Sequence, residues 1–64
     1  MQVNIKIKGK INQSWGKYFD GMTIQYNQDI TIFSGHIKDD AHMYGMINRM
    51  RDLNLKLISV NTTN

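Results

Sequence analysis

Four side chains of the types that bind metals lie close together in the sequence, at His36, Asp39, Asp40 and His42. Histidine nitrogens and carboxylate oxygens hold a metal ion when three or four of them converge at about 2.0–2.2 Å from it. The spacing does not favour that convergence, because Asp39 is well placed to cap a helix, with His42 in its first turn and His36 in the loop before it. We therefore expect a capped helix with two solvated histidines and no metal ion.

The sequence offers few candidate residues for acid–base or nucleophilic catalysis. Asp20 is one candidate acid, but it precedes Gly21, and an Asp in that position shapes a turn by accepting hydrogen bonds from backbone amides. The sequence has no cysteine, and its five glycines are scattered singly rather than gathered in a phosphate-binding loop. A chain of 64 residues also has little room for the pocket of about 300 Å³ or more that ligands need. We expect neither an enzyme nor a cofactor.

Length and composition indicate one small globular domain. Hydrophobic residues make up 41% of the chain and charged residues 20%, which is typical of a folded protein. We expect the domain to cover residues 1–60 and the polar residues 61–64 to form a frayed tail. The chain has no apolar run approaching the ~18 residues of a membrane span and no signal peptide, so we expect it in the cytoplasm.

The net charge of +3 is a weak indication of binding to polyanions. The excess of lysine over acid lies in the first 38 residues, and it falls short of the clustered basic surface of a dedicated nucleic-acid binder. The abundance of Asn, Ile and Lys would also follow from an AT-rich genome, in which case the lysine count carries less information about function.

Hydrophobic periodicity predicts four strands and two helices. Alternation of apolar and polar residues marks the strands, whereas apolar residues three and four apart mark the helices. The first helix has Asn12 or Ser14 as its cap and Gly21 after its end, and its type, α-helix or a single 3₁₀ turn, stays open. The second helix has Asp39 as its cap and Asn54 at the left-handed position that ends it. The predicted strands cover 3–8, 22–26, 30–33 and 56–60, and the predicted helices cover 13–20 and 40–53.

This order of elements predicts an α+β domain of ferredoxin-like β-α-β-β-α-β topology. Its sheet has four antiparallel strands, of which the first and third are central neighbours, and both helices cover one face.

Two stretches resemble a family of small uncharacterised prokaryotic proteins. Residues 18–24, YFDGMTI, resemble that family's segment WFDGLTI, and residues 32–60 are similar to its ending GxxxDQAALHGLLxRIRDLGLxLLSV. The resemblance covers about two thirds of the chain, and its shared His falls at Tyr44. It supports the fold and implies no catalytic residue. The departures include Asp40 for Gln, Met43 and Met46 for Leu, and Asn54 for Gly, and these four keep polarity, volume or turn geometry.

The face of the sheet without helices is the candidate interaction surface. On the predicted register it carries Lys6, Lys8, Thr31 and Phe33, and the aromatic ring of Phe33 is unusual on a face exposed to solvent. We expect this open face, or an edge strand, to pair with a second copy in a homodimer, because a small core gains stability from self-association. The alternative is weak binding of single-stranded nucleic acid by Phe33 and the lysines. A single exposed hydrophobic side chain without function is the third possibility.

Overall fold

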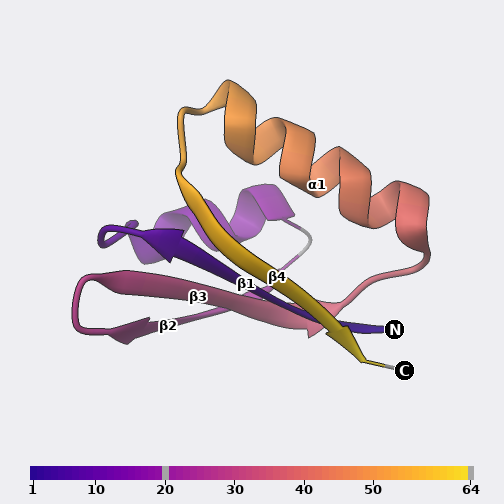
Figure 1. The fold of residues 1–64 in the computed structure, drawn as a ribbon, viewed down its shortest axis with the longest axis horizontal. Helices are drawn as coiled ribbons and strands as arrows, with labels where there is room; N and C mark the ends of the chain where they lie inside the picture. Colours follow the sequence, from indigo (N-terminus) through magenta and orange to yellow (C-terminus); the bar gives the residue numbers. More distant parts are fainter. Residues whose placement is uncertain (20, 64) are drawn as a thin grey trace.

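The computed structural model of the chain describes residues 1–19 and 21–63. The structure is a small α+β fold whose two helical segments lie on the same side of one sheet (Figure 1). The predicted succession of six elements is confirmed. They are β1 (Gln2–Lys8), the 3₁₀-helix η1 (Gln13–Phe19), β2 (Thr23–Asn27), β3 (Ile30–His36), α1 (Asp40–Asp52) and β4 (Leu57–Thr63).

The sheet has four strands in the order β2-β3-β1-β4, and all neighbouring strands are antiparallel. The first and third strands are therefore central neighbours, as their sequences led us to expect. Val3, Ile5 and Ile7 of β1 are buried, whereas Asn4, Lys6 and Lys8 between them are exposed. The strict alternation of β1 thus separates a side facing the helices from an open side.

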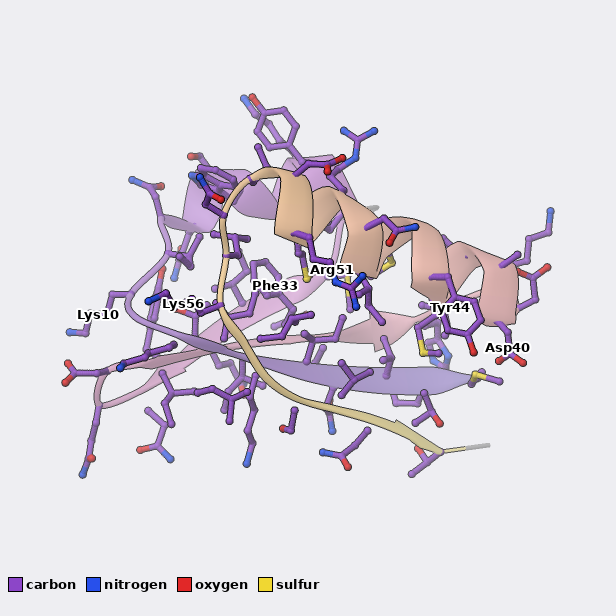
Figure 2. All side chains as sticks on the ribbon, turned by 45° about the horizontal axis from the view of Figure 1, so that its top comes forward. Lys10, Phe33, Asp40, Tyr44, Arg51 and Lys56 are labelled. Atoms are coloured by element: carbon purple, nitrogen blue, oxygen red, sulfur yellow. The ribbon has the colours of Figure 1, made fainter. Side chains whose placement is uncertain are left out.

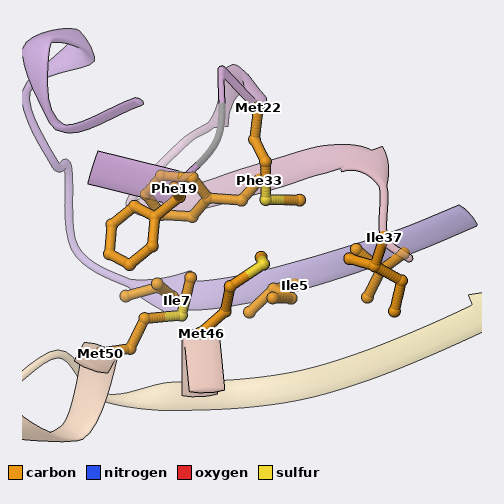
Figure 3. Packing of buried hydrophobic residues seen from close by; sticks show 9 residues of the cluster. Ile5, Ile7, Phe19, Met22, Phe33, Ile37, Met46 and Met50 are labelled. Carbon is orange, nitrogen blue, oxygen red and sulfur yellow. The ribbon is translucent and has the colours of Figure 1, made fainter. Parts of the chain in front are cut away.

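The core lies between the sheet and the helical segments (Figure 3). The rings of Phe19 and Phe33 meet edge to face, with their centroids 5.3 Å apart. Helix α1 contributes Met46 and Met50, which are buried members of the predicted apolar stripe. The buried cluster consists of Val3, Ile5, Ile7, Phe19, Met22, Phe33, Ile37, Met46 and Met50.

Both ends of α1 are fixed by the residues that the sequence indicated. The Asp39 carboxylate accepts a hydrogen bond of 2.9 Å from the backbone N–H of His42, which confirms the N-cap. At the other end, Asn54 has a φ of 62°. The N–H of Asn54 donates to the carbonyl of Arg51, and that of Leu55 donates to the carbonyl of Met50, the pattern that closes a helix at a left-handed residue.

The first helical segment is a 3₁₀-helix of seven residues rather than an α-helix. Its buried residues, Gly16 and Phe19, are three apart, which is the period of a 3₁₀-helix. Tyr18 consequently lies outside the core with 54% of its surface exposed, whereas an α-helix would place it on one apolar stripe with Trp15 and Phe19. The backbone N–H of Ser14 donates to the Asn12 side chain, so Asn12 is the cap. The predicted last residue of this helix, Asp20, lies outside the described residues.

The predicted frayed tail is instead the end of β4. Residues 61, 62 and 63 stand opposite Asn4, Val3 and Gln2 of β1. Pairing with the first residues of β1 satisfies backbone groups on both strands, so these polar residues are ordered without being buried. The last residue of the tail lies outside the described residues.

Candidate interaction surfaces

The predicted interaction surface is divided between the two faces of the sheet. Lys6 and Lys8 are exposed on the open face, as expected. Phe33 and Thr31, however, are completely buried. Figure 2 shows Phe33 on the side of the sheet that the helices cover. The placement of Phe33 and Thr31 on the open face was wrong.

The pairing of β3 with β1 explains this error. Phe33 stands opposite Ile5 and Thr31 stands opposite Ile7, and residues directly opposite each other point to the same face of a sheet. Since Ile5 and Ile7 face the helices, their partners do so too. Ile32, which the alternation had placed inside, stands opposite Lys6 on the open face and is only half-buried.

Thr31 has a structural role inside the fold. Its hydroxyl accepts a hydrogen bond of 2.8 Å from the backbone N–H of Ile11 and donates one of 2.6 Å to the carbonyl of Gly9. These two bonds attach the connection after β1 to the start of β3. Both polar functions of the buried hydroxyl are thereby satisfied, which removes the cost of burying it.

The open face is a polar surface with an aliphatic centre. Ile30 and Ile32 of β3 are half-buried there and stand opposite Lys8 and Lys6. Of the Phe and Tyr side chains of the described strands, the register places none on this face, because Tyr26 stands opposite Thr31 and therefore faces the helices. The one ring that these strands place on the face is the imidazole of His36, at the end of β3 and opposite Gln2. The other polar residues that share the face are Gln2, Asn4, Thr23, Gln25, Asn27, Ser34, Ser59, Asn61 and Thr63.

The outer edge of β4 is a second candidate surface. β4 is the last strand of the sheet, and its seven residues, LISVNTT, include neither a charged residue nor proline. Natural edge strands usually carry such residues or are very short, because unpaired backbone groups attract other strands. β4 contains an irregularity where it pairs with Lys6 and Ile7, and Ile58 next to it is 51% exposed. The other edge, β2, is shorter, with five residues.

A third surface is a groove between η1 and α1, here called the helical groove. It has a volume of about 650 Å³ and is lined by Trp15, Lys17 and Tyr18 from η1, by Gly45 and Arg49 from α1 and by Leu53, the residue after α1, among others. A neighbouring hollow of about 460 Å³ shares Lys17, Tyr18, Gly45 and Arg49 with it. The expectation that so short a chain lacks room for a ligand-sized pocket was therefore wrong.

Asp39 and His42 together fix the start of α1, whereas His36 is the last residue of β3 rather than part of the loop. Besides the cap at Asp39, the Nδ1 atom of His42 accepts a hydrogen bond of 3.0 Å from the backbone N–H of Lys38. His42 takes the position that Glu or Gln has in a capping box, but its side chain accepts from Lys38, the residue before the cap, rather than from the cap residue Asp39. Within residues 1–19 and 21–63, no group of three or more His, Asp or Glu side chains is close enough to hold a metal ion. No helix of the same residues is long and apolar enough to cross a membrane.

Comparison with known proteins gives a family but no activity. The sequence profile of a family described as a domain of unknown function (DUF8691) matches residues 2–61. No match to a curated protein or to a solved structure was found. The match runs from β1 into β4 and ends two residues before the end of that strand, so it includes the helical groove and most of the other two surfaces.

Proposed function

Because the chain belongs to DUF8691, a family of domains of unknown function, we propose its function from its own surfaces. It is a non-enzymatic, self-associating module, and two copies form a homodimer by pairing their β4 strands.

The observation that carries this proposal is the outer edge of β4, which includes neither a charged residue nor proline. A two-fold axis at Val60, the middle residue of Leu57–Thr63, would place the whole strand opposite its copy in antiparallel pairing. Two four-stranded sheets would then join as one sheet of eight strands. Val60 stands opposite Ile5 within its own chain, so the two Val60 side chains would meet on the helix side and extend the core across the axis.

Charge favours the edge over the open face as the contact. Stacking two open faces would bring Lys6 and Lys8 of one copy against the same lysines of the other. Like charges brought close together in a partly dry interface repel strongly. Pairing at β4 keeps the lysines, which lie on the central strand β1, away from the two-fold axis.

The size of the domain gives a reason for self-association. A chain of 64 residues buries only about 60% of the surface that its unfolded form exposes, so its stability is marginal. Binding a second copy stabilises the folded state by mass action. The side chain of Ile58, half of which is exposed in the single chain, would lose water contact in the dimer.

Sedimentation velocity over a dilution series tests this proposal. The unaltered chain should sediment as a dimer that dissociates on dilution. Ile58→Lys should be monomeric at the same concentrations, because a lysine at an edge strand opposes pairing. The side chain is exposed, so folding should be retained, which circular dichroism can check.

Two further variants make the test specific. Tyr44→Lys replaces another exposed hydrophobic residue, 60% exposed on α1, and should leave the dimer intact. Ile32→Lys adds a charge at the centre of the open face and should also leave it intact. A chain that is monomeric throughout contradicts the proposal. So does a dimer that Ile32→Lys disrupts and Ile58→Lys does not, since it would join open faces.

We further propose that the fold is ferredoxin-like. The strand order β2-β3-β1-β4 with both helical segments on one side supports this assignment. The 3₁₀ character of η1 is a departure from the usual pair of α-helices.

Weak binding of single-stranded nucleic acid by the open face remains the alternative. Its support is the exposure of Lys6 and Lys8 side by side with Ile32. Of the rings on which such domains stack bases, the described residues of this face offer only His36 at the end of β3, so we propose contacts with phosphates only.

A further inference from the structure

The helical groove contains a glycine that the fold does not require. Gly45 lies within α1, where glycine destabilises a helix by about 1 kcal/mol relative to alanine. Apart from its two chain neighbours and the nearby backbone of its own helix, a Cβ atom built on Gly45 would meet no described atom within 4 Å. By contrast, a Cβ on Gly16 would lie 3.2 Å from the carbonyl of Met22. Packing thus explains why residue 16 is a glycine, but no contact within the described chain explains why residue 45 is one.

The position of Gly45 suggests a reason outside the chain. It lines both the helical groove and the neighbouring hollow, so a side chain there would project into open space that a bound molecule can occupy. Glycine is the residue that lets a ligand approach a backbone closely.

The η1 wall of the groove is aromatic. Trp15 and Tyr18 contact each other edge to face, with centroids 6.1 Å apart, and Tyr18 is 54% exposed. Leu53, on the opposite wall, is 40% exposed. An apolar ligand body would bury these surfaces, which the chain itself leaves in contact with water.

The charged residues of the groove favour the binding of an anionic ligand. Lys17 from η1 and Arg49 from α1 line both hollows. Asp52 lines only the larger one, so two cations face one carboxylate there. Lys17 Nζ lies 5.6 Å from the centre of the Tyr18 ring, which places a positive charge beside the aromatic wall. Arg49 forms no ion pair with any described residue.

We propose that the helical groove is a binding site for a small amphipathic carboxylate. The carboxylate lies between Lys17 and Arg49, and its aromatic or aliphatic body packs on Trp15 and Tyr18 and over Gly45. The volume of about 650 Å³ falls within the range of about 300–1,000 Å³ found for small-molecule sites. The site does not depend on the pairing of β4, because none of its described lining residues belongs to that strand.

Amide NMR spectra of the full chain can test this site with phenylbutyrate as the probe and phenylbutanol as its neutral counterpart. The chain has one tryptophan, so the indole N–H signal of Trp15 reports from the groove itself. Phenylbutyrate should shift this signal and the Gly45 amide in a saturable manner, in the low millimolar range for so small a ligand. It should bind about tenfold more tightly than phenylbutanol, because a charge-assisted hydrogen bond is stronger than a neutral one.

Two arginine variants distinguish binding in the groove from nonspecific attraction of an anion to a positively charged protein. Arg49→Ala and Arg51→Ala remove the same charge from the same helix, but only Arg49 lines the groove. Arg49→Ala should reduce the preference for the carboxylate about tenfold, whereas Arg51→Ala should leave it unchanged. Gly45→Leu should abolish binding of both probes, and Gly45→Ala should weaken it while raising the midpoint of thermal unfolding.

Three results would overturn the proposal. One is the absence of saturable shifts at Trp15 and Gly45. The second is equal binding of phenylbutyrate and phenylbutanol, and the third is an equal loss in the two arginine variants. None of them bears on the oligomeric state, so failure of this site and failure of the β4 dimer are distinguishable.

Discussion

Phe33 and Ile32 are adjacent in β3 and belong to opposite regions of the molecule. Phe33 is completely buried and contacts Phe19 in the core, whereas Ile32 is half-buried on the open face between Lys6 and Gln25. Both residues are large and apolar, so their own chemistry does not decide which face each takes. The partner strand decides, because Ile5 of β1 stands opposite Phe33.

Truncating the two side chains should give the largest difference in stability. Phe33→Ala should lower the free energy of unfolding by about 3–5 kcal/mol, because it leaves a cavity in the core. Ile32→Ala should lower it by only about 1 kcal/mol, since much of the side chain is already in water. Urea unfolding followed by circular dichroism measures both values.

A domain of this size has little stability to lose, so Phe33→Ala could be unfolded before urea is added. Phe33→Leu then provides a measurable value, which should be a loss of about 1 kcal/mol. Equal losses in the variants of Phe33 and Ile32 would contradict the assignment of faces.

A matched pair of threonines sharpens the comparison. Thr31→Val keeps the volume of a buried side chain but leaves the N–H of Ile11 and the carbonyl of Gly9 without their partner. It should cost about 1–3 kcal/mol. Thr23→Val makes the same change on the open face, where Thr23 is exposed, and should change stability by less than about 0.5 kcal/mol. Similar urea midpoints for the two variants would show that the two hydrogen bonds of Thr31 contribute little.

The elements that the sequence predicted well are those with local signals. β1 alternates without error, and α1 has Asp39 at its start and Asn54 at its end, so short-range chemistry fixes both elements. The central pairing of β1 with β3 also followed from the order of elements. These signals act within a few residues and do not require knowledge of the packed structure.

The features that the sequence missed depend on contacts between distant segments. In β3, apolar residues occur at both odd and even positions, so alternation alone does not show which face Phe33 takes. Its face is determined only when β3 pairs with β1. The 3₁₀ geometry of η1 turns Tyr18 outward, and the residues after Val60 are ordered by pairing with the start of β1. The helical groove was missed for the same reason. Its shape depends on the spacing of η1 and α1, although Gly45, an interior helix glycine, was a signal in the sequence.

The smallest expected effect concerns the binding of single-stranded RNA by the lysines of the open face. If it contacts phosphates through Lys6 and Lys8 alone, the logarithm of the binding constant falls with the logarithm of salt concentration by about 0.7 for each contact. Lys6→Ala/Lys8→Ala should therefore reduce this slope by about 1.4, with no change in stability. Lys38→Ala/Lys56→Ala removes the same charge from exposed positions outside the strands and should leave the slope unchanged. Equal slopes in all three proteins, measured by fluorescence anisotropy with a mixed-sequence oligonucleotide, would exclude the open face as the binding surface. Since His36, at the end of β3, is the one ring that the described residues place on this face, any binding should also depend little on base sequence.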